Sequence, residues 1–356
     1  RDFMRIALES QKLGYRVRVY TLLWQGDIPE GFEVFIVPAS AITNHSRYRL
    51  YYDWVSEHLS HWPAGAVVGF NKMPGLDIYY AADSCYEDKA RNQRSLFYRA
   101  LPRYEMFSRF EKAVFSRSSA TEILMISPVQ VPLFEKYYET QRRRLHLLSP
   151  GIDRDRIAPS DRKEIRNAFR REMGIGEAQL LLLMVGSGFI TKGLDRALIA
   201  VAALPAELRS RTRMIVIGQD SPRRFLRMAK RLGVSDRLTF LKGRDDIPRF
   251  LLGADLLLHP AYIENTGTVL LEAIVAGLPV LATDVCGYAH YIEDAGAGRL
   301  IPSPFQQETF NGLLQSMLLS EERHAWSENG IAFSRHADIY DMPKRAAEFI
   351  DKAINS

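Results

Sequence analysis

The sequence predicts an α/β protein with two parallel-sheet domains that face each other across a cleft. Three observations lead to this prediction. Short apolar runs alternate with helical patterns along the whole chain. These runs are continuously apolar, which is typical of parallel strands covered on both faces. The 356 residues also exceed the usual size of a single hydrophobic core.

The first half begins with a helical pattern that leads into strands. Apolar residues at helical spacing run from Phe3 to Leu13, and Gly14 is a C-cap candidate. The strands predicted next lie in YRVRVYTLLW, FEVFIVPA, AVVGF, DIYYAAD and EILMIS. Because a parallel α/β domain seldom begins on a helix, we expect the first strand of this domain, and the loop after it, to precede the printed sequence.

The second half repeats the alternation after an interruption. Its predicted strands lie in QLLLLMVGSG, RMIVIGQD, LTFLKG, LLLHPA and PVLATDV. Pro, Gly and charged residues interrupt the pattern at 147–162, which indicates a domain boundary. We predict one domain over 1–150, a second over 151–335, and a helical segment over 336–356 that crosses back to the first. Open parallel sheets bind ligands at the carboxyl ends of their strands, so the cleft is the expected site.

Composition narrows the class of protein. The hydrophobic fraction of 47% and the charged fraction of 25% are those of a folded soluble protein. The apolar runs are too short to cross a bilayer, and no secretory signal opens the chain. Cys85 and Cys286 lack the spacing of metal ligands, which favours a reducing, cytoplasmic setting without a structural disulfide. The net charge of +5 indicates a mild preference for an acidic partner.

A candidate phosphate site follows the strand in QLLLLMVGSG. Gly186, Ser187 and Gly188 end this strand, and a helix is predicted after Gly193. Small residues there let backbone N–H groups approach an anion, and Lys192 adds a full positive charge. The order TKGL differs from a Walker motif, and the acidic residue of a dinucleotide fold is absent. The alternative is an ordinary turn with a solvated lysine.

A second candidate site surrounds another strand-to-helix turn. Asn265, Thr266 and Gly267 form this turn, and Thr266 or Thr268 is a potential helix cap. Glu272 lies inside the otherwise apolar helix VLLEAIVAG, where an unpaired carboxylate is costly. Either Glu272 pairs with a buried donor or an arginine elsewhere in the fold, or it receives a ligand rich in hydroxyl groups.

The spacing of Glu264 and Glu272, eight positions apart in ENTGTVLLEAIVAGLPVLATDV, resembles the double-glutamate signature of the retaining family 4 glycosyltransferases of the GT-B fold. GSGFITKG resembles their phosphate turn, and PGID is similar to their interdomain linker. Within that family FNKMPGLDIYYAADSCY, HPAYIENTGTVLLEA and CGYAHYI look closest to members that add the first glucose to the inner-core heptose of lipopolysaccharide. The resemblance implies two Rossmann-like domains, the first for the acceptor and the second for the nucleotide sugar.

The resemblance also implies a retaining, UDP-glucose-dependent hexosyltransferase that needs no metal or other cofactor. Glu272 would accept hydrogen bonds from the ribose hydroxyls, Glu264 would position the glucose, and Lys192 would offset charge on the leaving diphosphate. The donor site would be completed by Gly186, Gly188, Asn265, Thr266 and Gly267. DRD at 153–155 lies in the linker, so we do not expect it to bind a metal.

Several positions extend or depart from the family pattern. Ser187 stands where most members carry an arginine, so Arg244 in KGRDD is expected to supply the second cation. Asp83 in AADSCY falls where many relatives have a histidine facing the anomeric carbon, and we expect it in the catalytic site; the alternative is a strand-end Asp that caps the next helix. Asn71 and Lys72 are expected to contact a phosphorylated heptose acceptor. The family's glycine-rich loop after its first strand would precede the printed sequence.

A basic and aromatic stretch spans residues 86–117, with eight Lys/Arg against four Asp/Glu. Cations beside aromatic rings suit an anionic membrane surface, and the lipid-linked acceptor implied by the resemblance favours such contact. We therefore expect a cytoplasmic protein, peripherally bound to the inner membrane, that does not bind nucleic acid. The alternative is an amphipathic helix that packs its aromatics inward.

Two other functions fit the same residues. One is a GT-B transferase with a different donor sugar or acceptor. The other is a sugar-nucleotide-binding module without transfer activity, because binding residues alone do not establish turnover.

Overall fold

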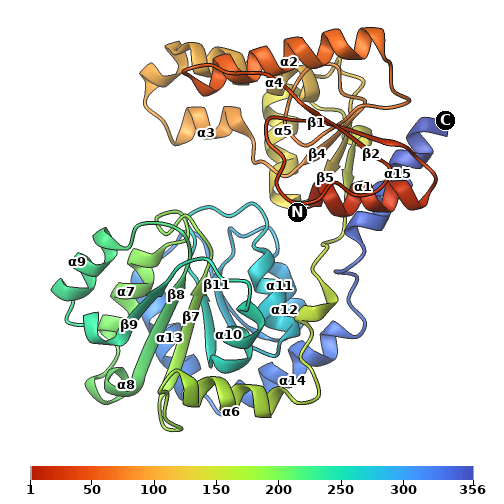
Figure 1. Cartoon of the computed structure of the whole chain (residues 1–356). Coiled ribbons are helices and arrows are strands. Elements are labelled where there is room, and N and C mark those ends of the chain that lie inside the picture. Colours follow the sequence, from red (N-terminus) through yellow and green to blue (C-terminus); the bar gives the residue numbers. More distant parts are fainter. Residues whose placement is uncertain (1, 356) are drawn as a thin grey trace. The chain divides into compact units, whose positions relative to one another are not determined.

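The structure is a computed structural model that describes residues 2–355, and the chain divides into two units (Figure 1). Unit 1 comprises the residues up to Gly151 and those from Asp341 on; unit 2 spans Ile152–Tyr340. The chain thus returns to unit 1 at its end. There α15 (Met342–Asn355) packs beside α1 (Asp2–Lys12), and both helices contribute to one apolar cluster.

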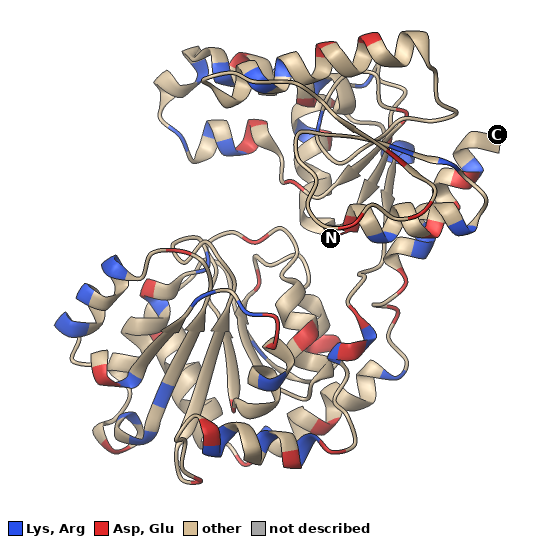
Figure 2. Cartoon of the chain, viewed as in Figure 1, with Lys and Arg blue, Asp and Glu red and all other residues tan. Residues whose placement is uncertain are grey.

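Unit 1 contains two parallel sheets. The smaller has the order β1-β2 and the larger β3-β4-β5-β6. The strands are β1 (Val17–Thr21), β2 (Phe32–Ile36), β3 (Val68–Gly69), β4 (Ile78–Ala81), β5 (Glu122–Met125) and β6 (Leu145–Leu147). Besides α1 and α15, the helices are α2 (Asn44–His61), α3 (Tyr86–Asn92), η1 (Leu96–Ala100), α4 (Pro102–Phe115), η2 (Pro128–Gln130), α5 (Val131–Tyr138) and η3 (Arg142–Arg144). Lys and Arg recur along α3 and α4 (Figure 2).

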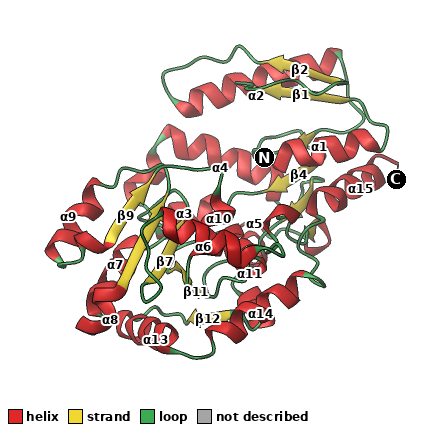
Figure 3. Cartoon of the chain, turned by 60° about the horizontal axis from the view of Figure 1, so that its bottom comes forward, coloured by secondary structure: helices red, strands yellow, loops and turns green. Residues whose placement is uncertain are grey.

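Helices cover both faces of the larger sheet because alternate residues of its strands point to opposite sides. Tyr79 and Ala81 of β4 join a cluster with residues of α4 and α5, whereas Ile78 and Tyr80 join one with residues of α1 and α15. The smaller sheet lies beside α2 (Figure 3), where the Tyr20 hydroxyl and His58 Nδ1 are 2.9 Å apart.

Unit 2 has one parallel sheet of six strands in the order β12-β11-β10-β7-β8-β9. The strands are β7 (Leu180–Val185), β8 (Thr212–Ile217), β9 (Leu238–Leu241), β10 (Leu256–His259), β11 (Val280–Thr283) and β12 (Gly298–Ile301). The helices are η4 (Arg154–Arg156), α6 (Arg162–Glu172), α7 (Leu194–Ala203), α8 (Ala206–Arg211), α9 (Arg223–Arg231), η5 (Ser235–Arg237), α10 (Ile247–Gly253), α11 (Thr268–Val275), α12 (His290–Asp294), α13 (Gln307–Leu319) and α14 (Arg323–Ser334).

The apolar strand β7 is buried on both faces, as predicted. Leu181 and Leu183 join a cluster with residues of α6, α10, α11 and α12, and Leu182 joins the opposite cluster with residues of α7, α8, α9 and α13. Every run predicted as a strand contains one, and β6 and β12 are additional. The alternation of strands and helices therefore places the carboxyl ends of β7 and β10, neighbours in the sheet, at one edge.

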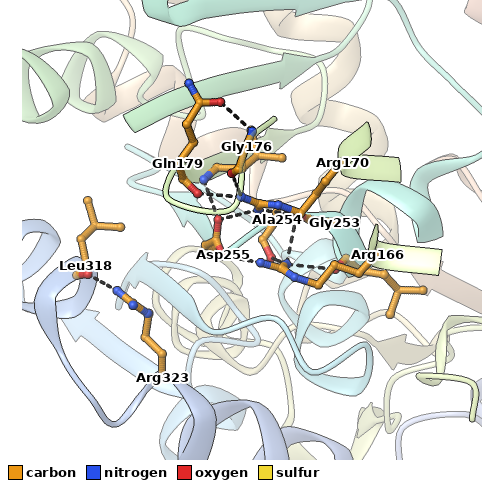
Figure 4. Close-up of polar contacts among 11 residues, drawn as sticks. Arg166, Arg170, Gly176, Gln179, Gly253, Ala254, Asp255, Leu318 and Arg323 are labelled. Carbon is orange, nitrogen blue, oxygen red and sulfur yellow. Dashed lines mark hydrogen bonds and ion pairs between the residues drawn. The ribbon is translucent and has the colours of Figure 1, made fainter. Parts of the chain in front are cut away.

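A polar network anchors α6 at the opposite edge of this sheet (Figure 4). Arg166 and Arg170 both pair with Asp255, which precedes β10, at 2.5 and 2.9 Å. Asp255 also accepts a hydrogen bond from the Leu181 amide at 2.7 Å. The remaining guanidinium N–H groups donate to backbone carbonyls, including that of Gly253 at the end of α10. This network satisfies buried charges and ties the first helix of unit 2 to its sheet.

The structure also addresses the expectations about a disulfide and about membrane-spanning helices. Cys85 and Cys286 are free and buried, and burial raises the pKa of each thiol to about 12. Across residues 2–355, no helix combines the length and the apolar character needed to cross a membrane.

Candidate functional site

The turn after β7, which is the candidate phosphate site at residues 186–193, has a backbone that requires glycine. Gly186, Gly188 and Gly193 have φ of +130°, +83° and +75°. A Cβ on Gly193 would lie 2.0 Å from the Pro260 carbonyl oxygen, so a side chain does not fit there. A Cβ on Gly186 would lie 3.2 Å from Cε of Lys192. The turn therefore brings the lysine side chain back over the end of β7, close to the segment that follows β10.

A carboxylate missed by sequence reasoning holds this turn. The amides of Gly188 and Phe189 both donate to Asp220 Oδ2, the second at 2.7 Å. Asp220 lies in the loop after β8, next to β7 in the sheet. Two N–H groups expected to face a phosphate thus already have an anionic acceptor, so Lys192 is the stronger candidate for binding a diphosphate here.

Lys192, Glu264 and His259 form the polar centre of the site. The Lys192 ammonium is bound to Glu264 Oε2, and the same oxygen lies 3.2 Å from His259 Nε2. His259 is the last residue of β10 and is completely buried. No role was predicted for it, although a polar residue at the end of the apolar run LLLH indicates a side chain at the ligand-binding edge of the sheet. The structure brings together two of the predicted catalytic residues, Lys192 and Glu264.

Burial and charge set the protonation states in this cluster. Burial alone would raise the pKa of Glu264, but the hydrogen bond from His259 and the charge of Lys192 outweigh it and lower the pKa to about 2. Burial lowers the pKa of His259, which keeps its ring neutral, so that Nε2–H donates to the carboxylate. Glu264 is therefore an anion at neutral pH, held in place by one cation and one neutral donor.

The turn after Glu264 leads directly into α11. Gly267 is the N-cap residue with φ of +86°, and no side chain caps the helix, so the predicted capping by Thr266 or Thr268 is wrong. A Cβ on Gly267 would lie 3.4 Å from Cγ of Glu264. Asn265, Thr266 and Gly267 thus lie between Glu264 and the helix start. The Thr266 carbonyl accepts a hydrogen bond from the Tyr288 amide at 2.8 Å.

Glu272 has an arginine partner from the linker. Its side chain is buried in α11, and Oε1 lies 3.7 Å from Nε of Arg156 in η4. Ala158, two residues further along the linker, donates its amide to the Val275 carbonyl of α11 at 3.0 Å. The first segment of unit 2 therefore packs along the helix that carries Glu272. The sequence allowed either an arginine partner or a ligand for this carboxylate. Arg156 is such a partner, and its ion pair is compatible with a ligand that also binds Glu272.

Arg244 is paired within its own loop. It follows β9, and its guanidinium forms two hydrogen bonds with Asp246 at 2.7 and 2.8 Å. The side chain is exposed and lies over the Phe250 ring at 5.1 Å. Within residues 2–355, no contact joins Arg244 to Lys192 or Glu264. A second cation for a diphosphate therefore has no support from the local geometry.

Asp83 lies in unit 1, at the carboxyl end of β4. It lines a cavity together with Asn71 and Lys72, the other residues predicted to contact the acceptor. The Lys72 ammonium is bound to the fully buried Glu111 and to the Ser84 carbonyl. Glu111 also accepts hydrogen bonds from the Tyr86 and Glu87 amides at the start of α3. Lys72 therefore has a structural partner, whereas Asp83 is exposed in the cavity.

No cluster of three or more His, Cys, Asp or Glu side chains suited to a metal ion occurs among residues 2–355. Metal independence itself stays a prediction.

Comparison with known proteins decides the family. The sequence model of the glycosyl transferases group 1 family matches residues 165–333. The lipopolysaccharide glucosyltransferase WaaG of Escherichia coli K12 is 48% identical over 351 residues, covering 98% of this chain and 94% of the relative. The chain belongs to this glycosyltransferase family. A crystal structure of WaaG, at 47% identity, superposes with a TM-score of 0.92 over 98% of this glycosyltransferase chain and 95% of that chain.

More distant relatives support the same fold. Anabaena Alr3699/HepE, in complex with UDP-glucose, has a TM-score of 0.68 at 18% identity over 98% of this chain and 95% of that chain. A D-inositol 3-phosphate glycosyltransferase of Streptomyces avermitilis is 29% identical over 61% of this chain and 48% of the relative. The predicted GT-B fold of this glycosyltransferase is confirmed.

Proposed function

We propose that this glycosyltransferase transfers glucose from UDP-glucose to the inner-core heptose of lipopolysaccharide, with retention of configuration. The observation that carries the proposal is near full-length identity of 48% with a lipopolysaccharide glucosyltransferase. The paired Lys192 and Glu264 at the ends of β7 and β10 support it, because they place a cation and an anion where open α/β sheets bind ligands.

In this proposal the residues of unit 2 form the donor site. Lys192 offsets the charge that develops on the diphosphate as the bond between its oxygen and C1 of glucose breaks. The oxygen of the acceptor hydroxyl forms the new bond to C1, and its proton passes to the released diphosphate oxygen. Glu264, ionised and fixed by His259, accepts hydrogen bonds from glucose hydroxyls. Glu272 accepts them from the ribose, while Arg156 balances its charge. Gly186, Gly188 and Asn265 to Gly267 shape the wall around the diphosphate, and no metal takes part.

Asp83 completes the proposed catalytic set from unit 1. Its exposed carboxylate at the end of β4 can accept a hydrogen bond from a sugar hydroxyl. A ligand role is favoured over the alternative of capping α3, because no side chain caps this helix and the amides of Tyr86 and Glu87 at its start donate to Glu111.

We also propose that the protein is cytoplasmic and binds the inner membrane through residues 86–117. The alternative of inward-packed aromatics holds for part of the stretch, since Phe110 and Phe115 are buried. Leu96 and Phe97 of η1, however, are 78% and 85% exposed, between the exposed cations Arg94 and Arg99. Such a segment suits an anionic lipid surface. Sedimentation with vesicles tests this: binding should increase with anionic lipid content, and indifference to it would contradict the proposal.

The transfer reaction is tested by incubating the protein with a panel of UDP-sugars and heptose-terminated core lipid, with and without a chelator. We expect a mass increase of one hexose with UDP-glucose, unaffected by the chelator. Product from another donor alone would exclude the glucose assignment, and binding of UDP without any product would favour a module without transfer activity. Loss of product in chelator would contradict metal independence.

A further inference from the structure

A cavity of about 310 Å³ lies within unit 1, at the carboxyl ends of β3 and β4. Its walls come from three helices as well as from the loops after the two strands. The lining residues are Asn44 and Tyr48 of α2, Asn71 and Lys72 after β3, Asp83 and Ser84 after β4, Tyr86 and Lys89 of α3, and Arg103 and Phe107 of α4. The cavity is therefore formed by residues of one unit alone.

The cations of this cavity fall into two classes. Lys72 is neutralised by the buried carboxylate of Glu111. Lys89 and Arg103 are exposed, and no ion pair of either side chain occurs among the described residues. The Arg103 guanidinium lies 5.7 Å from the centre of the Phe107 ring, a contact that uses none of its N–H groups. Two cations of the lining are thus available to bind an anion. Among the described residues that line the cavity, Asp83 provides the single carboxylate.

The helices that carry these cations are held together by buried polar contacts. Glu111 fixes the start of α3 through the Tyr86 and Glu87 amides. Glu87 is itself buried and accepts a hydrogen bond from the Tyr104 hydroxyl of α4 at 2.8 Å. Lys89 follows Glu87 on α3, and Arg103 precedes Tyr104 on α4. The spacing between the two cation-bearing backbones is therefore set by the fold.

The remaining lining suits a saccharide. Tyr48, Tyr86 and Phe107 offer ring faces to the C–H groups of a sugar, and the amides of Asn44 and Asn71 can bind its hydroxyls. An arginine can bind the oxygens of a phosphate or a carboxylate in a bidentate manner, and a lysine adds a point charge.

We propose that this cavity binds the acceptor saccharide and that Lys89 and Arg103 recognise an anionic group on it, a phosphate or a carboxylate. The inference rests on the proposed function and adds to it the residues that recognise the charge of the acceptor. It also replaces Lys72, the cation expected from the sequence, by two residues of α3 and α4. Asp83 is then left for an uncharged hydroxyl, because an anion beside it would be repelled.

The test measures binding of a soluble, deacylated, heptose-terminated core oligosaccharide to the full chain in the presence of UDP. Three forms are compared: intact, dephosphorylated, and with its carboxylates amidated. The variants are Lys89→Gln and Arg103→Gln. The control is Arg49→Gln, which removes an exposed charge of α2 that forms no ion pair among residues 2–355 and lies next to the lining residue Tyr48 in the sequence.

We expect each cavity variant to raise Kd for the intact saccharide about tenfold, and the control to change it less than about twofold. Removing the recognised anion should weaken binding to the unmodified protein and abolish the difference between it and the variants. The form on which the difference disappears identifies phosphate or carboxylate as the source. Equal losses on all three forms, an equal loss in the control, or unchanged binding by both variants would overturn the inference.

Binding is read without turnover, so the result is independent of the reaction. A protein that binds the saccharide as described but forms no hexose product would refute the proposed function and leave the inference intact. A protein that transfers glucose but shows no anion-dependent difference in binding would refute the inference and leave the proposed function intact.

Discussion

The polar centre of unit 2 and the cavity of unit 1 handle charge in opposite ways. In unit 2, Lys192 and Glu264 neutralise each other, and the buried ring of His259 adds a neutral donor. In unit 1, Lys89 and Arg103 have no ion-pair partner among the described residues. The first arrangement fixes its side chains before any ligand arrives, whereas the second leaves its cations for the ligand to neutralise.

This difference determines what a substitution costs. In unit 2, removing one charge leaves its partner buried and uncompensated, so folding and chemistry are both affected. In unit 1, removing an exposed cation should change ligand binding with little effect on stability.

The largest effect is expected from Lys192→Gln. The variant removes the cation proposed to stabilise the leaving diphosphate, and turnover should fall by a factor of about 10²–10³. Steady-state kinetics with UDP-glucose measures this. Lys230→Gln, an exposed change on α9, is the control and should keep full activity. Turnover within a few-fold of the unmodified protein would show that Lys192 serves only its structural pairing with Glu264.

Asp83→Ala should lower turnover by a factor of about 10, in the range of a lost charge-assisted hydrogen bond to substrate. The affinity for UDP should not change, since all proposed UDP contacts come from unit 2. Calorimetric titration with UDP, run beside the kinetic assay, separates the two effects. Unchanged turnover would return Asp83 to a purely structural role.

Glu272→Gln should weaken UDP binding about tenfold while the protein stays folded, because the neutral amide binds ribose hydroxyls less well than a carboxylate. Arg156→Gln tests the other half of the ion pair and should weaken UDP binding less. Titration with UDP and thermal unfolding measure both variants. A Glu272→Gln protein that is less stable but binds UDP as before would mean that the carboxylate serves only its pairing with Arg156.

The smallest effect is a pH dependence of stability from His259. Because burial lowers the pKa of His259 in the folded state, the unfolded chain binds an extra proton below pH 6.5, and folding loses stability as pH falls. Lys192 and Glu264 are the charged groups that face the ring. The free energy of unfolding should therefore decrease steadily as the pH falls below 6.5.

His259→Gln keeps a donor near Nε2 but cannot titrate, so its free energy of unfolding should change less between pH 7 and 5.5. Denaturant unfolding at both pH values measures the difference. Parallel curves for the two proteins would show that His259 does not contribute to the pH dependence.

The strands and the two turns were predictable because their signals are local. Apolar runs such as LLLLMV determine β7, and the Glu264–Glu272 spacing is contained within one turn and one helix. The partners that fix those turns are remote in sequence. Asp220 accepts a hydrogen bond from the amide of Gly188, which lies 32 positions away in the sequence. Arg156, which pairs with Glu272, comes from the linker. Such pairings depend on strand order, which periodicity does not specify.

The predicted cations that have an acidic partner in the structure illustrate the same point. Lys72 looked available because Glu111, 39 positions away, carries no local sign of burial against it. Arg244 looked suitable by its charge, but Asp246 in the same loop binds it. His259 was the exception, since its position at the end of an apolar strand was visible in the sequence and received no interpretation.

The central claim is that Lys192 and Glu264 act as one unit in glucosyl transfer. A double-mutant cycle on the turnover number with UDP-glucose, using Lys192→Gln, Glu264→Gln and the double variant, tests it most directly. The pairing predicts that the double variant is slower than the slower single variant by no more than about threefold, because each single change already disables the unit. Losses that multiply across the two substitutions would show that the residues act independently and would contradict the account.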